Sequence, residues 1–212
     1  MRPTLIGLHG YTMNAGLMRT ACAAALASLA EHVDLVYLDA PHACTPEAVQ
    51  NAYESWRVAP PPPPHLSWWR ASDDGRVYEG WERAAERVRE AIAEGAPVGL
   101  LGFSQGAMLT ATLAAMSARG AFPALQFVVL VAGSLPRAEA LQPLFDAPVA
   151  VPSLHVWGQR DQRAMTYSPK LLDAFDPATR ASHVWRGPHV VPPGGEPARA
   201  IGDFVRAQLA IA

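Results

Sequence analysis

The sequence predicts an α/β fold with a mostly parallel sheet of about six strands flanked by helices. Short apolar runs alternate with longer Ala-rich and amphipathic segments along the 212 residues. Parallel strands need crossover connections of this kind, which are usually helical. Half of the residues are hydrophobic and 17% are charged, as in ordinary globular proteins. We therefore expect residues 1–212 to form one domain with a substantial core.

The N-terminal third begins with a strand, a helix and a second strand. Thr4–Leu8 is a continuous apolar run that stops at His9-Gly10, as buried parallel strands do. Leu17–Ala30 is rich in Ala and Leu, which favour a helix. Val33–Leu38 alternates apolar and polar residues and ends before a proline turn, so it predicts the second strand.

The segment from about 43 to 76 has a different character. It contains five consecutive prolines, Pro60–Pro64, which exclude a helix or a central strand there. The same segment contains three tryptophans, Trp56, Trp68 and Trp69. We expect an irregular insertion that acts as a candidate flap rather than a domain boundary.

The remaining elements alternate regularly. Trp81, Ala84, Ala85, Val88 and Ile92 fall at helical spacing and predict an amphipathic helix within 77–94, ending at Gly95. The further strands expected are Val98–Phe103, Phe127–Ala132, Leu154–Trp157 and His183–Trp185, and the further helices are Gln105–Ala118 and Glu196–Ala210.

Charge and composition exclude several classes of function. The formal net charge is −2 and the pI is about 6.4, so no basic surplus indicates binding to nucleic acid. No run of about 18 apolar residues predicts a membrane span, and the N-terminal run looks like a strand rather than a secretion signal. Two cysteines, Cys22 and Cys44, favour free thiols in a reducing cytoplasm, although a single bridge between them stays open. No Cys/His pattern has zinc spacing and no glycine-rich phosphate loop is present, so neither a metal nor a cofactor is expected.

The strongest chemical signal is Gly102-Phe103-Ser104-Gln105-Gly106. It fits G-x-S-x-G, and it stands between a predicted strand and a predicted helix, the context in which this motif presents a nucleophilic serine in the α/β-hydrolase fold. The glycines leave room for a sharp turn, and the start of the helix offers N–H groups to a developing oxyanion. The sequence therefore predicts Ser104 as a nucleophile, against the alternative of an ordinary glycine-rich turn.

A serine nucleophile needs a base and an orienting acid, which follow it along the chain in this order: serine, acid, histidine. Asp161 follows the strand at 154–157, and His189 lies in the loop after the last strand. We expect these two residues to complete a Ser-His-Asp triad. The alternative acids are Asp146, Asp173 and Asp176, and the other histidines are His9, His32, His42, His65, His155 and His183.

The oxyanion hole should combine the N–H of Gln105 with an N–H from the loop after the first strand. Tyr11 is the first choice there and Thr12 the second. Four aromatic residues are expected to line a substrate pocket under the insertion, although they could equally pack a small core of their own. They are Trp56, Trp68, Trp69 and Phe103.

Six segments resemble, in order, the FSH family of small serine hydrolases. They are LHGYTMN, YLDAPH, the Trp68-Trp69 pair, LLGFSQGAMLTATLA, PSLHVWGQRD and GPHVVP. The resemblance extends from residue 4 to about 205 and is weakest across 43–95; the carboxylesterase and acyl-protein thioesterase group also carries GFSQG. The resemblance to the FSH family implies the α/β-hydrolase fold, the triad Ser104, Asp161 and His189, and hydrolysis of carboxylic esters or thioesters. The chain departs from the family by having Pro188 before His189, where the family often has glycine, and by its proline run.

These observations predict a serine esterase that hydrolyses carboxylic esters of short to medium acyl chains through an acyl-enzyme. An acyl thioesterase is the alternative within the same chemistry. A cofactor-free perhydrolase or lyase would share the triad. A non-catalytic binding protein of the same fold is the alternative from another class.

Overall fold

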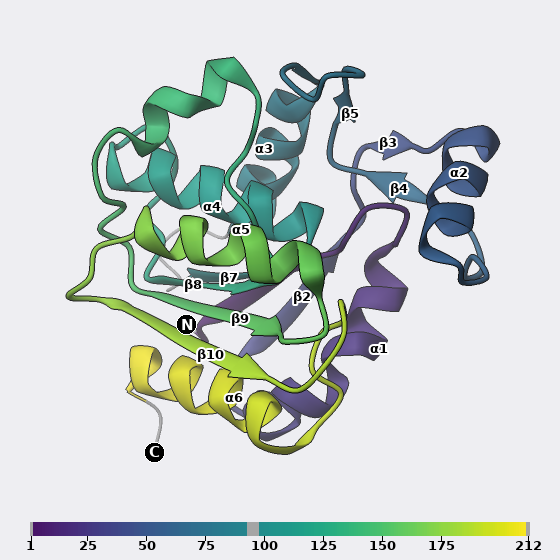
Figure 1. The fold of residues 1–212 in the computed structure, drawn as a ribbon. Helices are drawn as coiled ribbons and strands as arrows, with labels where there is room; N and C mark the ends of the chain where they lie inside the picture. The colour runs from purple at the N-terminus through teal and green to yellow at the C-terminus, as the bar shows by residue number, and fades with distance from the viewer. Residues whose placement is uncertain (1, 93–97, 211–212) are drawn as a thin grey trace.

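A six-stranded parallel sheet forms the centre of the protein in a computed structural model, which describes residues 2–92 and 98–210. The strand order is β10-β9-β8-β7-β1-β2 (Figure 1). The strands are β1 (Thr4–Leu8), β2 (Asp34–Leu38), β7 (Val98–Phe103), β8 (Phe127–Val131), β9 (Ser153–Gly158) and β10 (Arg180–Trp185). All six predicted strands are confirmed, and the bounds of β1 and β7 are those expected.

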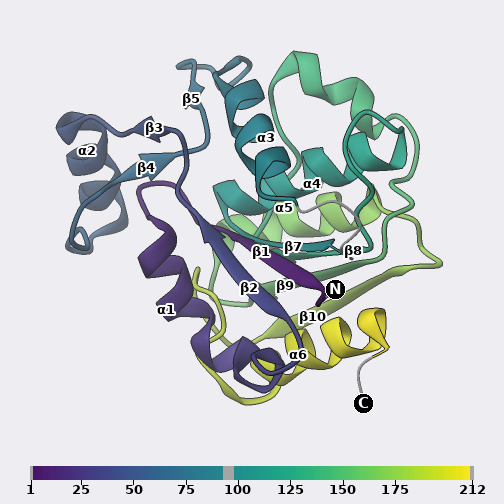
Figure 2. The same cartoon turned by 180° about the vertical axis from the view of Figure 1, so that it is seen from behind.

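Helices cover both faces of this sheet (Figures 1 and 2). On one face lie α3 (Trp81–Glu90), α4 (Gln105–Ala118) and α5 (Gln162–Asp173), with a 3₁₀ helix at Glu139–Phe145. On the other face lie α1 (Ala15–Leu26), which continues into a 3₁₀ turn at Ala27–Leu29, and α6 (Gly195–Leu209). Each face buries its own apolar cluster, so the architecture has three layers.

The strand and the helix on either side of Ser104 are deeply buried. All six residues of β7 are buried, and α4 is buried continuously from Gly106 to Ala115. A helix that is apolar on all sides must be covered on all sides. Here β7 and β8 pack beneath α4, and the 3₁₀ helix at 139–145 also contacts it. The residue between β7 and α4 therefore rests on a rigid support.

The predicted irregular insertion is wrong in part, because residues 46–56 form a helix, α2 (Pro46–Trp56). The Thr45 side chain caps it by accepting from Ala48 N–H, and Pro46 occupies its first turn. These residues are a helix-start signal that the nearby proline run obscures. The antiparallel pair β3 (His42–Ala43) with β4 (Leu66–Ser67) flanks α2, and a second pair, β5 (Arg70–Ala71) with β6 (Tyr78–Glu79), precedes α3.

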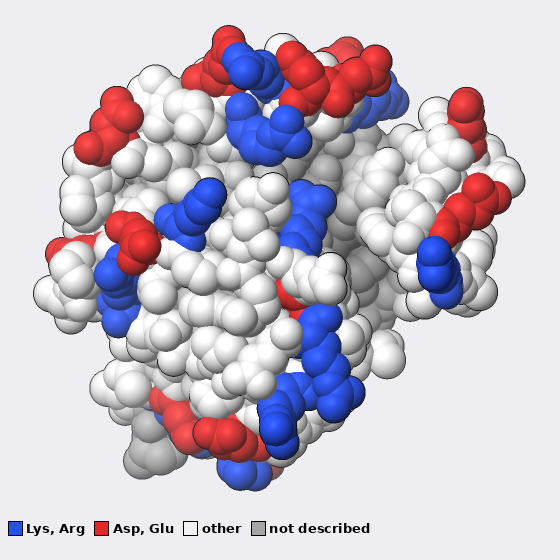
Figure 3. Space-filling view, in the orientation of Figure 1, with Lys and Arg blue, Asp and Glu red and all other residues white. Residues whose placement is uncertain are grey.

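Residues 43–67, called here the insertion lobe, project from the end of the sheet at which β7, β9 and β10 finish (Figure 1). A hollow separates the lobe from the body in the space-filling view, and Lys and Arg side chains line part of its edge on the body (Figure 3). The C-terminal ends of parallel strands are where sites in open α/β sheets gather.

One further sequence prediction is wrong in its bounds, and the expected free thiols are confirmed. The amphipathic helix expected over 77–94 spans Trp81–Glu90 instead, because Tyr78–Glu79 pair with β5 and the helix ends at its C-cap, Ala91. Gly95, its expected end, lies outside the described residues. Cys22 and Cys44 are free thiols, so the bridge left open above is absent. No helix within residues 2–92 and 98–210 is long and apolar enough to cross a membrane.

Candidate active site

Ser104 occupies a sharp turn between β7 and α4, with φ of 52° and ψ of −111°. A non-glycine residue at positive φ is strained, and such strain concentrates at functional sites. The Ser104 N–H donates to Val131 O of β8 at 2.9 Å, which holds the turn against the neighbouring strand.

The two glycines of the motif are required by close backbone contacts. A Cβ at Gly102 would lie 2.4 Å from Gly106 O, and one at Gly106 would lie 2.2 Å from Leu8 O. Both distances are far below van der Waals contact, and the atoms met belong to the backbone, which cannot rotate away. The motif therefore encodes the packing of α4 on β1 and β7 as well as the turn.

Ser104, His189 and Asp161 form a continuous chain of hydrogen bonds. His189 Nε2 lies 2.9 Å from Ser104 Oγ, and His189 Nδ1 is hydrogen-bonded to Asp161 Oδ2. The three residues are separated by 85 and 28 positions in sequence. They meet because β7, β9 and β10 run parallel and end at the same edge of the sheet.

Asp161 has a second contact that fixes its carboxylate. It is the N-cap of α5, and its Oδ1 accepts from Ala164 N–H at 2.9 Å. Burial alone would raise the pKa of this carboxyl, but the hydrogen bonds from His189 and from the helix N–H groups outweigh it and lower the pKa below its ordinary value. Asp161 is therefore ionised and oriented at neutral pH.

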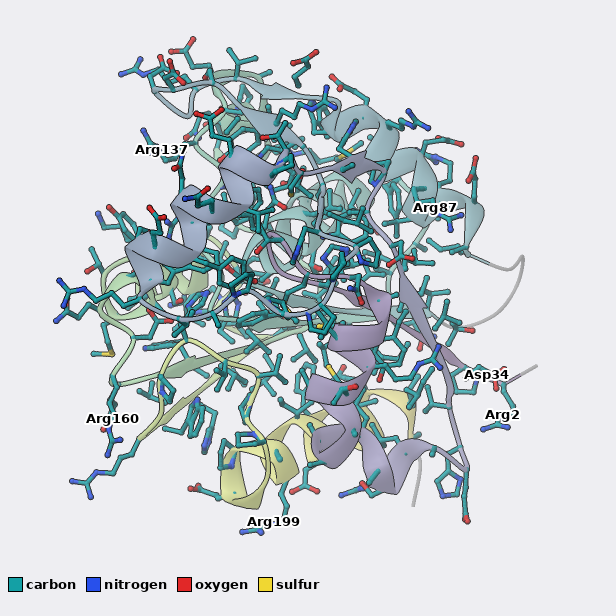
Figure 4. All side chains as sticks on the ribbon, turned by 90° about the vertical axis from the view of Figure 1, so that its right-hand side faces the viewer. Arg2, Asp34, Arg87, Arg137, Arg160 and Arg199 are labelled. Atoms are coloured by element: carbon teal, nitrogen blue, oxygen red, sulfur yellow. The ribbon has the colours of Figure 1, made fainter. Side chains whose placement is uncertain are left out.

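The loops that carry Asp161 and His189 are bound to each other. Gln159 N–H donates to Trp185 O at 2.7 Å, and Arg160 N–H donates to Gly187 O at 2.9 Å. A Cβ at Gly158 would lie 2.0 Å from Gly187 O, so only glycine permits this approach. Figure 4 looks onto this end of the molecule, where Arg160 lies at the edge opposite Asp34. The role of Gly158 was not recognised from the sequence, because it depends on two loops that are distant along the chain.

The alternative acids lie apart from Ser104. Asp146 follows the 3₁₀ helix at 139–145, Asp173 forms an ion pair with Arg180, and Asp176 accepts from Ala178 N–H. Among the described residues, His189 is the histidine that contacts Ser104 Oγ.

The other histidines have different surroundings. His155 is buried, and this burial together with the charge of Arg180 lowers its pKa to about 3. His183 faces Glu196 at 4.0 Å. His42 and His65 contact backbone carbonyls, and His32 is exposed before β2.

The predicted oxyanion donors are Gln105 N–H, directly after Ser104, and Tyr11 N–H, in the loop after β1. Neither Tyr11 N–H nor Gln105 N–H donates to an acceptor among the described residues, whereas Thr12 N–H donates to Leu66 O at 2.9 Å. His9 supports this loop from inside, because its Nε2 accepts from Ala40 N–H and its carbonyl accepts from the Trp68 indole. Burial lowers the pKa of His9, which favours the neutral ring that such an acceptor requires.

The Gln105 side chain has a role that the motif alone did not reveal. Its Oε1 accepts from Trp68 N–H at 3.0 Å, and its Nε2 lies 3.4 Å from Trp69 O. The residue after the serine therefore anchors the tryptophan pair to the start of α4.

The four aromatic residues expected to line a substrate pocket have different surroundings. Trp68 is fully buried, and Trp69 is buried with its ring stacked on Tyr78 at 4.5 Å. Phe103 is buried beneath the His189 ring, with 5.0 Å between ring centroids. Trp56 lies on α2 and is half-exposed. These contacts favour packing for Trp68 and Trp69, and a role in substrate binding stays a prediction for all four.

No group of three or more His, Cys, Asp or Glu residues within the part of the chain that the structure describes is placed to hold a metal ion.

The sequence is similar to those of known serine hydrolases and esterases. The family model described as serine hydrolase (FSH1) matches residues 1–200. Esterase OVCA2 of Danio rerio is 32% identical, with 95% of this chain and 96% of the relative covered. Esterase OVCA2 of Bos taurus is 31% identical, with 95% and 94% covered.

Solved structures show the same fold. Esterase PE8 superposes with a TM-score of 0.67 at 18% identity, covering 97% of this chain and 92% of that one. Acyl-protein thioesterase 2 of Zea mays superposes with a TM-score of 0.69 at 18% identity, covering 98% and 94%. The chain thus has the α/β-hydrolase fold and belongs to the FSH1 family of serine hydrolases.

Proposed function

We propose that this serine hydrolase is an esterase that cleaves carboxylic esters of short to medium acyl chains through an acyl-enzyme on Ser104. The observation that carries the proposal is the hydrogen-bonded chain from Ser104 Oγ through His189 to Asp161. A serine, an imidazole and a buried carboxylate in this order are the parts that acyl transfer needs.

In the proposed reaction His189 Nε2 takes the proton from Ser104 Oγ as the oxygen attacks the acyl carbon. Asp161 holds the imidazole with its proton on Nδ1 and stabilises the imidazolium that forms. The tetrahedral oxyanion accepts hydrogen bonds from Tyr11 N–H and Gln105 N–H, and His189 then gives its proton to the leaving alcohol. A water molecule, deprotonated by His189, releases the acid and restores Ser104.

The insertion lobe is proposed as a flap over this site, since it borders the hollow beside the strand ends (Figure 3). We also propose a cytoplasmic location, because the two cysteines of the chain are free thiols.

The test is the turnover of p-nitrophenyl acetate and butyrate by the native chain and by Ser104→Ala. Turnover should fall by at least about a thousandfold in the variant, because the triad acts as a unit. A thioester of the same acyl group, assayed in parallel, distinguishes an esterase from a thioesterase. Ester turnover that persists in Ser104→Ala would overturn the mechanism, and the absence of turnover in the native chain would favour a non-catalytic binding protein.

A further inference from the structure

The insertion lobe contains a groove of about 880 Å³. Its volume lies within the range of small-molecule sites in proteins. Its walls are α2 on one side and the proline-rich segment on the other, and neither Ser104 nor His189 belongs to its lining. The lining residues are Ala43, Cys44, Pro46, Val49, Gln50, Tyr53, Glu54, Arg57, Val58, Ala59, Pro60, Pro63, Pro64, His65 and Leu66.

The chemistry of the walls favours an uncharged, apolar occupant. Most lining residues are aliphatic, aromatic or proline, and the two residues with formal charges, Glu54 and Arg57, have opposite signs. Val58 is 58% exposed although it is a large aliphatic residue. An apolar chain laid against these walls would remove that surface from water, which is favourable.

The groove is joined to the proposed oxyanion loop through Thr12. Thr12 is fully buried and has φ of 63°, a conformation that is strained for a β-branched residue. Its N–H donates to Leu66 O at 2.9 Å, its Oγ1 is hydrogen-bonded to Tyr53 Oη at 3.0 Å, and its carbonyl lies 3.0 Å from His65 Nδ1. All three partners also line the groove.

A fourth contact lies on the same loop, where Asn14 Nδ2 donates to Pro64 O at 2.9 Å. Pro64 is another lining residue. The residues that hold Thr12 and Asn14 in place are therefore residues that a ligand in the groove would touch. Tyr11, the proposed oxyanion donor, immediately precedes Thr12 in the chain.

We propose that this groove binds the uncharged acyl chain of the ester substrate, beyond the carbonyl that Ser104 attacks. The proposal rests on the proposed function, because it assigns the chain of that same substrate. An acyl chain fits this position. Its carbonyl would be held at Tyr11 N–H, and its apolar part would extend along the groove walls that contact Thr12, the residue after Tyr11.

The experiment compares p-nitrophenyl acetate with p-nitrophenyl octanoate on the native chain, on Val58→Asp and on Val77→Asp. Val58 lines the groove, whereas Val77 precedes β6 outside it, and their exposed fractions are 58% and 61%. The same new charge is thus placed at two equally exposed valines. Because both side chains are largely exposed, neither variant should unfold the protein.

We expect kcat/KM of the native chain to be at least about tenfold higher for the octanoate than for the acetate, because several methylenes leave water. Val58→Asp should remove most of that ratio, because its carboxylate opposes burial of the longer chain in the groove. Val77→Asp should keep the native ratio. A native ratio near one, or an equal loss for both esters in Val58→Asp, would overturn the groove proposal.

A binding measurement on Ser104→Ala keeps this test independent of catalysis. Octanamide, which is uncharged, is titrated while tryptophan fluorescence is recorded, because Trp56 packs edge-to-face on the groove residue Tyr53 at 5.0 Å. Binding should saturate in Ser104→Ala, should be weakened at least about fivefold by adding Val58→Asp, and should be unaffected by adding Val77→Asp. Octanamide that fails to bind, or binds equally in all three chains, contradicts the groove assignment whether or not Ser104 is the nucleophile.

Discussion

Replacing Asp161 by asparagine separates the two hydrogen bonds that this carboxylate makes. Oδ1 accepts from Ala164 N–H and caps α5, whereas Oδ2 accepts from His189 Nδ1. Asparagine keeps an oxygen for the cap but places an NH₂ group, a donor, toward His189. The imidazole must then accept at Nδ1 and carry its proton on Nε2, where it can no longer accept the proton of Ser104.

The two consequences have different magnitudes. The value of kcat/KM for p-nitrophenyl butyrate should fall by about 10³–10⁴-fold in Asp161→Asn, the loss that a wrong tautomer causes in a triad. The melting temperature should stay within about 2 °C, because Asn and Asp are nearly equal as N-caps. Asp161→Ala is the matched control: it should lose a similar factor in rate and, in addition, about 1 kcal/mol of stability, which corresponds to about 2–4 °C for a chain of this size.

The assays are initial rates of p-nitrophenol release and thermal unfolding followed by circular dichroism. Activity of Asp161→Asn within tenfold of the native chain would refute an orienting role for Asp161. A melting temperature as low in Asp161→Asn as in Asp161→Ala would refute the separation of the two oxygens.

Three further predictions concern the supports of the site. Gln105→Leu removes both side-chain hydrogen bonds to the tryptophan pair and should lower the free energy of unfolding in urea by about 1–2 kcal/mol; an unchanged urea midpoint would contradict this. Gly158→Ala puts a Cβ 2.0 Å from Gly187 O and should lower kcat/KM by at least about tenfold through displacement of the base loop. Gly194→Ala, where a Cβ meets nothing within 4 Å, is its control, and an equal effect in both would argue against loop displacement. Burial of His155 lowers its pKa from 6.5 to about 3, so the unfolded chain binds more protons between these values and stability falls as the pH drops through that window. His155→Leu should therefore lose less unfolding free energy than the native chain between about pH 7 and about pH 5, and an identical loss would show that His155 is not responsible.

The parts of the fold that could be predicted are those whose signal is local. β1 and β7 are uninterrupted apolar runs between turn residues, and α4 is an Ala-rich run closed by Gly120. The local pattern of apolar residues and the composition are therefore enough to predict these three elements. β10 begins at Arg180, three residues before the predicted start, because its first residues are polar and gain their pairing from β9. α2 was not predicted, because the five prolines that follow it exclude regular structure only at their own positions, whereas the Thr45-Pro46 start signal is short.

The candidate active site likewise has residues that the sequence predicts and contacts that it does not. Ser104, Asp161 and His189 could be proposed because the motif and the order of strand ends require nothing beyond the sequence. The contacts of Thr12 with Tyr53 and His65 could not be predicted, since they join the loop after β1 to an insertion about 40 to 50 residues later, and no local sequence pattern encodes them. The same holds for the Gln105 side chain and the Trp68 backbone.

The most direct test of Ser104 as the nucleophile is to map a fluorophosphonate label by mass spectrometry. The native chain should gain one phosphonyl group, located on the peptide that contains Ser104, and His189→Ala should label far more slowly because the base is absent. Ser104→Ala should remain unlabelled. Stoichiometric labelling of Ser104→Ala, or a label on another residue of the native chain, would contradict the assignment on which the proposed mechanism depends.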